Sequence, residues 1–89
     1  MRVQFSSRFE RDFAKAPATV QRAFRKQLRY LLDQGPAYPS LNAHPWPAHG
    51  PDARQARINR GWRFYFYQTG DTYVVYHLQA HPKRTQRRR

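Results

Sequence analysis

The chain has 89 residues, enough for one domain with a small hydrophobic core. It contains no cysteine, which excludes disulfides, thiolate nucleophiles and cysteine-based metal sites, and no apolar run approaches the ~18 residues of a membrane span. Its 17 Lys and Arg residues against five Asp and Glu residues give a formal charge of +12, which predicts an anionic partner: nucleic acid, an acidic protein or, as a weaker alternative, a membrane surface.

The N-terminal residues predict a short strand and a helix. Residues 2–5 alternate, with Val3 and Phe5 on one face. Ser7-Arg8-Phe9-Glu10 fits a capping box, so we expect the first helix to begin at Arg8. The N-terminus lacks the apolar segment of a signal peptide, and we therefore expect a cytoplasmic protein.

A second helix follows at Pro17, a residue that suits the first turn because it has no N–H to leave unpaired. Its apolar side chains recur at helical spacing and predict a buried stripe. The stripe consists of Val20, Ala23, Phe24, Leu28, Leu31 and Leu32. Gly35-Pro36 ends the helix.

A proline-rich loop and three strands complete the chain. The five prolines between Gln34 and Asp52 exclude regular structure there, and Trp46 indicates that the loop packs on the body. We expect strands at about 54–59, 62–68 and 72–80, joined by Asn59-Arg60-Gly61 and Thr69-Gly70-Asp71. Gly61 is expected to supply the positive φ of the first turn.

These elements predict an α+β fold with the order β-α-α-β-β-β. Two N-terminal helices would pack on one face of a four-stranded, mainly antiparallel sheet. We expect a single domain over residues 1–82, because Pro82 stops the last strand. The basic tail 83–89 has no apolar residue and should be mobile in the free protein.

The hairpin at 54–68 carries the candidate functional surface. Ala56, Ile58, Phe64 and Phe66 share its apolar face. The opposite face carries Gln55, Arg57, Arg63 and Tyr65. Guanidinium and phenol groups in this arrangement can hold phosphates, although solvated arginines on a half-exposed sheet would give the same pattern.

The last strand also alternates, with Val74, Tyr76 and Leu78 on one face. Val75, His77, Gln79 and His81 lie on the other. If the Val74 face packs on the helices, His81 emerges beside Arg57 and Arg63. We expect no zinc site, because His77 and His81 are ~13 Å apart on a strand, and His44 and His49 lack a matching carboxylate or thiol.

Four segments, in this order, carry a family resemblance. They are Phe5-Ser6-Ser7-Arg8-Phe9-Glu10-Arg11-Asp12-Phe13, Pro39-Ser40-Leu41 with His44, Arg57-Ile58 before Gly61-Trp62-Arg63, and the late His81. Together with the β-α-α-β-β-β order, they resemble the RelE/ParE toxin superfamily of type II toxin–antitoxin systems over about the whole chain. The most similar branch is that of the ribosome-dependent mRNA interferases.

The resemblance implies a RelE-like domain that cleaves mRNA in the ribosomal A site and so inhibits translation. It implies a metal-independent endoribonuclease without cofactors, in which the 2′-hydroxyl attacks the adjacent phosphate and a 2′,3′-cyclic phosphate is formed. The implied partners are the ribosomal RNA, mRNA and a cognate antitoxin whose toxin-binding segment is acidic. No membrane partner is implied.

Individual roles follow from the same resemblance. Arg63 matches an arginine that contacts the scissile phosphate, His81 a histidine near the leaving group, and Arg57 a frequent arginine of the preceding strand. The proton acceptor stays open among His44, His81 and a group of the substrate, while Tyr65 could stack on a base or donate to phosphate. The remaining candidate RNA-binding residues are Arg22, Arg25, Lys26, Arg29, Arg54, Gln55, Arg60, Trp62, Lys83 and Arg84.

Two other functions remain open at this point. The gyrase-inhibiting branch of the superfamily, similar to ParE, has the same fold and does not cleave RNA. A non-catalytic RNA-binding or ribosome-binding module would need the basic surface but not His81.

Overall fold

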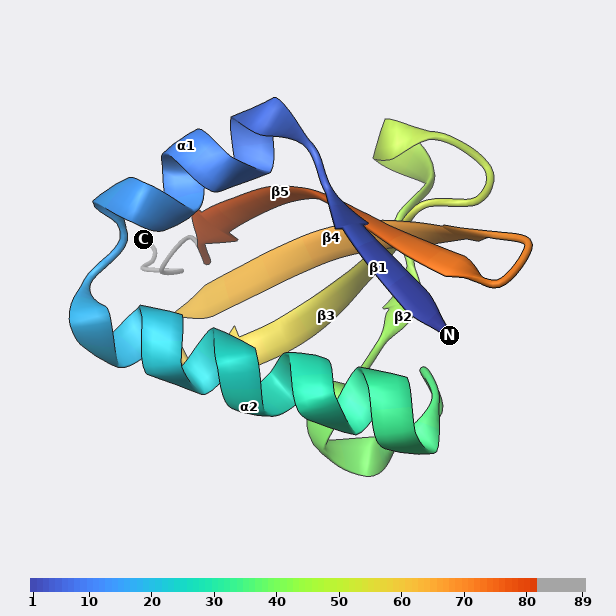
Figure 1. Cartoon of the computed structure of the whole chain (residues 1–89), viewed down its shortest axis with the longest axis horizontal. Helices are drawn as coiled ribbons and strands as arrows, with labels where there is room; N and C mark the ends of the chain where they lie inside the picture. Colours follow the sequence, from blue (N-terminus) through green and yellow to red (C-terminus); the bar gives the residue numbers. More distant parts are fainter. Residues whose placement is uncertain (82–89) are drawn as a thin grey trace, which may run out of the picture.

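The computed structural model describes residues 1–81, in which two helices pack against a five-stranded mixed sheet. The elements are β1 (Arg2–Phe5), α1 (Ser7–Lys15), α2 (Ala18–Gln34), η1 (Pro39–Leu41), β2 (His44–Pro45), η2 (Pro47–His49), β3 (Arg54–Asn59), β4 (Trp62–Thr69) and β5 (Thr72–Ala80) (Figure 1). The α+β class is confirmed, with one strand more than expected. The predicted tail and Pro82 lie outside the described residues.

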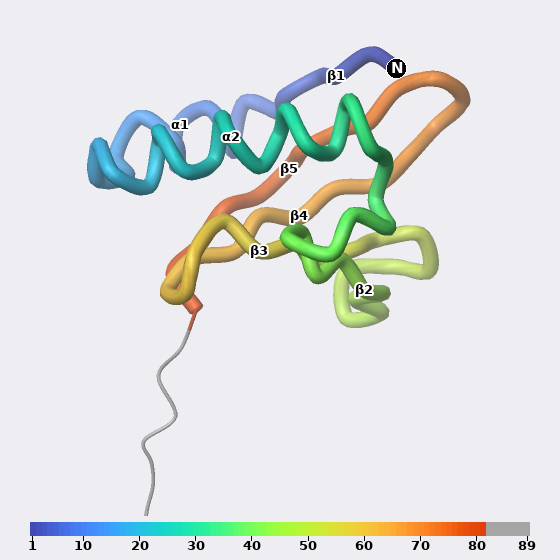
Figure 2. The backbone as a smooth tube through the Cα atoms, turned by 90° about the horizontal axis from the view of Figure 1, so that it is seen from below, coloured from blue at the N-terminus to red at the C-terminus, as the bar shows by residue number. Residues whose placement is uncertain are grey.

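The sheet has the order β1-β5-β4-β3-β2, with β1 parallel to β5 and the other pairs antiparallel. Both helices lie on one side of it, and the loop that carries β2 and η2 lies on the other (Figure 2). No helix within residues 1–81 combines the length and apolarity that a membrane crossing requires.

Helix α1 begins one residue earlier than predicted, because Ser6 rather than Ser7 caps it. The Ser6 hydroxyl accepts a hydrogen bond from the Phe9 N–H at 3.0 Å, which satisfies one of the free donors of the first turn. The same hydroxyl donates to the Tyr76 carbonyl at 3.0 Å. Ser6 therefore joins the start of α1 to β5.

Helix α2 is bounded as the sequence indicates. Pro17 is its N-cap, and Gly35 ends it with a φ of 84°, a conformation that suits glycine. Val20, Phe24 and Leu31 are buried as predicted, whereas the other stripe residues are only partly buried. Phe24 contacts Phe64 of β4 edge to face, with ring centroids 5.1 Å apart, and so anchors the helix on the sheet.

The proline-rich segment contains more regular structure than predicted. Pro45 belongs to the two-residue strand β2, which pairs with β3 through His44–Gln55 and Pro45–Arg54. Because β2 is the edge strand of the sheet, a proline there removes no obligatory hydrogen bond. Leu41 is fully buried and Trp46 contacts Tyr65, so the loop packs on the body as expected.

The β3–β4 turn is closed by a side chain rather than by a left-handed glycine. The Asn59 side-chain oxygen accepts a hydrogen bond from the Gly61 N–H at 2.9 Å. Gly61 is not among the residues with positive φ, so that expectation was wrong. The β4–β5 turn does use a left-handed glycine, Gly70, with a φ of 59°.

A bulge in β5 changes which of its residues face the helices. The pairing with β4 moves from Tyr65–His77 to Phe66–Val75, which leaves Tyr76 as the extra residue. Tyr73, Val75 and Leu78 are consequently in the core. The predicted common face of Val74, Tyr76 and Leu78 is therefore wrong.

Candidate nucleic-acid interface

Two rows of polar side chains cross the sheet on the side away from the helices. One row is Arg57–Arg63–Gln79, and the other is His44–Gln55–Tyr65–His77, as the register of β2 to β5 sets them. We call this side the front face. The intervening residues Ala56 and Phe64 are fully buried on the opposite side, which confirms the predicted alternation of the hairpin.

Arg57 and Arg63 lie directly opposite each other across β3 and β4. Like charges in such a cross-strand pair destabilise a sheet. Burial and, secondarily, the Arg57 charge lower the pKa of Arg63, with Tyr65 opposing this. Arg63 nevertheless stays charged at neutral pH, as guanidinium groups in proteins do, so an anion placed between the two arginines would relieve the repulsion.

The Arg63 side chain is held by the adjoining turn. Its NH1 group donates to the carbonyls of Asn59 at 2.7 Å and Trp62 at 3.0 Å. These hydrogen bonds fix the position of the guanidinium while leaving other N–H donors available for a ligand. Arg57 is exposed on the neighbouring strand.

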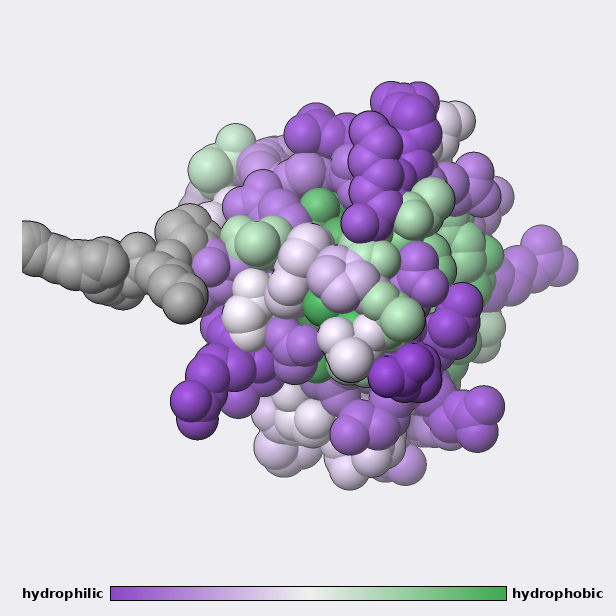
Figure 3. Space-filling view, turned by 90° about the vertical axis from the view of Figure 1, so that its left-hand side faces the viewer, coloured by the Kyte–Doolittle hydropathy of each residue, from purple (hydrophilic) through white to green (hydrophobic). Residues whose placement is uncertain are grey.

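His81 follows β5 at the same end of the sheet. Its backbone N–H donates to the Gly61 carbonyl at 2.7 Å, which places the residue opposite the β3–β4 turn. Strand alternation puts it on the side of Gln79, the residue that pairs with Arg63. The fold therefore brings Arg57, Arg63 and His81 to one end of the front face. Figure 3 views this end, where hydrophilic side chains surround a smaller pale and apolar area.

Tyr65 and Gln55 are buried, which contradicts a direct role for either of them at a substrate. Their side chains are 1% and 4% exposed, and the Gln55 amide donates to the Tyr65 hydroxyl at 2.9 Å. The rings of Trp46, His49 and His77 cover Tyr65, with centroid distances of 5.9, 4.9 and 5.3 Å. The alternation of residues along the strands predicted the correct face for Tyr65 and Gln55 but did not show that the proline-rich loop covers it.

His44 lies at the edge of the sheet that is farther from His81. Its Nδ1 is 2.9 Å from the Asn42 carbonyl oxygen, and its ring contacts Trp46. Three strand spacings separate β2 from β5, a span of ~14 Å. The structure therefore does not bring His44 and His81 together.

A polar cluster around the buried His77 lies beside the candidate site, and the sequence did not predict it. His77 Nδ1 is 3.3 Å from a carboxylate oxygen of Asp12 on α1, and its Nε2 is 2.7 Å from the Gln79 side-chain oxygen. The contact with His77 holds the side chain of Gln79, the residue that pairs with Arg63. The alternation that puts His77 and Gln79 on one face of the strand was visible in the sequence, whereas nothing in the sequence indicated the contact with α1.

The other predicted RNA-binding residues are divided between several surfaces. Those of α2 (Arg22, Arg25, Lys26 and Arg29) are exposed on the helix, on the side of the sheet opposite the front face. Arg54 is paired with Phe66 on the helix-facing side, and Trp62 packs against the core, as a structural role requires. Arg60 is exposed in the β3–β4 turn, and Lys83 and Arg84 lie outside the described residues.

Within residues 1–81 no group of three or more His, Asp or Glu side chains is arranged to hold a metal ion.

The fold is that of the RelE/ParE-superfamily toxins. The chain is similar to a YoeB/ParE toxin from Agrobacterium tumefaciens, with a TM-score of 0.77 and 15% identity over 92% of this chain and 100% of the other. It is also similar to YafQ from E. coli (TM-score 0.75, 15% identity, 90% and 93% covered). In a third structure, an E. coli DinJ–YafQ complex, the TM-score is 0.73 at 15% identity, with 91% and 94% covered. No protein-family model and no curated protein matches the sequence.

Proposed function

We propose that this protein is the toxin of a type II toxin–antitoxin system and that it cleaves mRNA in the ribosomal A site. The observation that carries the proposal is the Arg57–Arg63 cross-strand pair, placed at one end of a RelE/ParE-type sheet beside His81. Two juxtaposed guanidiniums cost stability in the free protein, and a phosphate between them would offset that cost.

The proposed reaction is an in-line displacement at phosphorus. The 2′-oxygen of the substrate forms a bond to the adjacent phosphorus, the bond to the 5′-oxygen breaks, and the products carry a 2′,3′-cyclic phosphate and a 5′-hydroxyl. Arg63, with Arg57, neutralises the charge that builds up on the phosphoryl oxygens. His81 transfers a proton to the leaving 5′-oxygen, because an imidazole titrates near neutral pH.

The acceptor of the 2′-hydroxyl proton is His44, His81 or a group of the substrate. Of these, His81 lies at the end of the sheet that carries the arginine pair. His44 serves this step only if the RNA spans the front face from β5 to β2. Tyr65 keeps a positioning role, since it supports the surface from beneath Trp46 and His49.

The charge of +12 suits both of the proposed partners. Ribosomal RNA and mRNA are polyanions, so binding should weaken steeply with added salt. A cognate antitoxin with an acidic segment would neutralise the same surface and inhibit the toxin. Such a system acts in the cytoplasm, where its ribosomal target is found.

The experiment is translation of a defined mRNA with purified ribosomes, followed by primer extension. We expect cuts at codon spacing only when ribosomes are present. Intact mRNA together with inhibited supercoiling would show that gyrase is the target. RNA binding without cleavage of mRNA in the presence of ribosomes would leave a non-catalytic module.

A further inference from the structure

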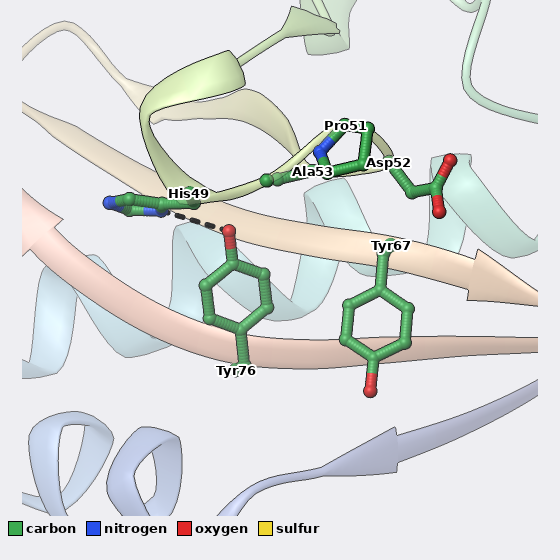
Figure 4. A pocket seen from close by; sticks show the side chains of 7 residues that line it. His49, Pro51, Asp52, Ala53, Tyr67 and Tyr76 are labelled. Atoms are coloured by element: carbon green, nitrogen blue, oxygen red, sulfur yellow. Dashed lines mark hydrogen bonds between the residues drawn. The ribbon is translucent and has the colours of Figure 1, made fainter.

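A pocket of about 350 Å³ opens on the front face, away from the arginine pair. The loop segment 49–53 forms one wall, and Tyr67 of β4 and Tyr76 of β5 form the other (Figure 4). The proposed cleavage chemistry uses none of these residues.

The tyrosine wall offers an aromatic surface to a planar ligand. The two rings lie side by side with centroids 6.0 Å apart, and Tyr67 is 37% exposed. The Tyr76 hydroxyl is 2.9 Å from Nδ1 of His49 (Figure 4). Burial, followed by the neighbouring Tyr65 and Tyr67, raises the pKa of Tyr76, so it stays a neutral phenol that can donate to His49.

The loop wall contributes a carboxylate. Asp52 is exposed at the Tyr67 end of the pocket, and among residues 1–81 it forms no ion pair. A carboxylate repels phosphate and accepts hydrogen bonds from N–H groups. The pocket therefore suits an uncharged aromatic ring that carries N–H donors.

We propose that this pocket binds an unpaired nucleobase of the RNA and that it prefers guanine. The base stacks on Tyr67, and the two N–H groups of its Watson–Crick edge donate to the Asp52 carboxylate. Adenine offers only an amino group at the corresponding edge and makes one fewer bond. The inference rests on the proposed function in that RNA is the ligand of the front face.

The position of the pocket defines which nucleotide it takes. Tyr67 follows Arg63 by four residues on β4, or ~13 Å along the strand. A base in the pocket therefore belongs to a nucleotide neighbouring the one whose phosphate lies at Arg63. Occupation of the pocket would contribute to sequence preference without any contact with the reacting atoms.

The test measures binding of the full-length protein, in the absence of ribosomes, to a fluorescent five-nucleotide RNA. The RNA carries 2′-O-methyl groups, which block attack by the 2′-oxygen. Affinities are compared for adenine oligonucleotides with and without one guanine. Tyr67→Ala should weaken binding of the guanine RNA by at least about fivefold, as expected for loss of one stacked base. Asp52→Asn should remove the preference for guanine over adenine.

Tyr30→Ala serves as the matched control. It removes a tyrosine that packs against Tyr38, with ring centroids 4.6 Å apart, outside the pocket. This variant should bind the guanine RNA within about twofold of the wild type, well below the change expected for a lost stacked base. Tyr67→Phe retains the ring and should recover most of the affinity that Tyr67→Ala loses. In the wild-type protein, NMR signals of the Tyr67 and Tyr76 rings should shift on RNA addition, whereas those of Tyr30 should not.

Equal losses in Tyr67→Ala and Tyr30→Ala, equal affinity for the two RNAs, or unmoved ring signals would each overturn the pocket assignment. These results are independent of the cleavage assay. Base-selective binding without cleavage of mRNA on ribosomes would retain the pocket and refute the nuclease. Cleavage without base-selective binding would retain the nuclease and refute the pocket assignment.

Discussion

Gln27 provides a test of how the fold holds the arginine surface in place. Its side chain is 2% exposed, between α2, η1 and β3. The amide donates to the carbonyls of Ser40 at 3.0 Å and Arg57 at 2.8 Å, and its oxygen accepts from the Ser40 hydroxyl at 3.0 Å. Replacement by methionine keeps the volume and removes all three hydrogen bonds.

We expect Gln27→Met to lower the free energy of unfolding by about 3 kcal/mol, since each buried hydrogen bond contributes roughly 1 kcal/mol. In a domain of this size that loss corresponds to a fall in Tm of roughly 12–24 °C. Urea titration followed by circular dichroism measures it. The matched control is Gln21→Met, which loses one bond, from the Gln21 amide to the Phe13 carbonyl at 2.8 Å. Equal costs for the two variants would refute the reasoning.

Three further outcomes are expected. Arg57→Ala should reduce the slope of log K against log salt for single-stranded RNA by about 0.7, as for one lost phosphate contact; an unchanged slope in fluorescence anisotropy would remove Arg57 from the interface. Because the folded state raises the pKa of Tyr76, the free energy of unfolding should fall as the pH rises above ~10, and it should fall less steeply in Tyr76→Phe. Identical urea midpoints for both proteins across that pH range would contradict this. Trp46→Ala should uncover Tyr65 and lower the free energy of unfolding by about 2 kcal/mol, which is less than the ~3–5 kcal/mol expected for a fully buried ring. A wild-type urea midpoint in this variant would show that the Trp46 ring does not hold the loop.

The sequence predicted the elements that follow from local patterns. Alternation in the 54–59 and 62–68 strands gave the hairpin and its two faces, and helical spacing around Phe24 gave the buried side of α2. The ends of α2 followed from Pro17 and Gly35. These features depend on neighbours within a few residues, which a single sequence contains.

The features that were missed depend on distant contacts. The bulge at Tyr76 changes the alternation of β5 without any local sequence mark, because Val74, Val75 and Tyr76 all suit a strand on either face. Burial of Tyr65 depends on a loop more than ten residues away. Gln27 is polar at a core position, and only the folded chain supplies its partners from η1 and β3.

Within the candidate site, the sequence predicted that Arg57 and Arg63 share one face. The register confirms the shared face and adds that the two residues pair across β3 and β4. It also named His81, whose expected place depended on the wrong assumption that Val74 faces the helices. The bulge returns His77 and Gln79 to the front face and His81 with them.

The central claim is that Arg63 and His81 act on the scissile phosphate of mRNA on the ribosome. Single-turnover cleavage on stalled ribosomes tests it directly. The variants to compare are Arg63→Ala, Arg63→Lys and His81→Ala. The control is Arg2→Ala, which alters only a surface ion pair with Asp71 at 3.9 Å. Arg63→Ala and His81→Ala should each slow cleavage by ~100-fold or more, with Arg63→Lys faster than Arg63→Ala and Arg2→Ala at the wild-type rate. Wild-type cleavage by the Arg63→Ala and His81→Ala proteins, each shown to be folded by circular dichroism, would contradict the account.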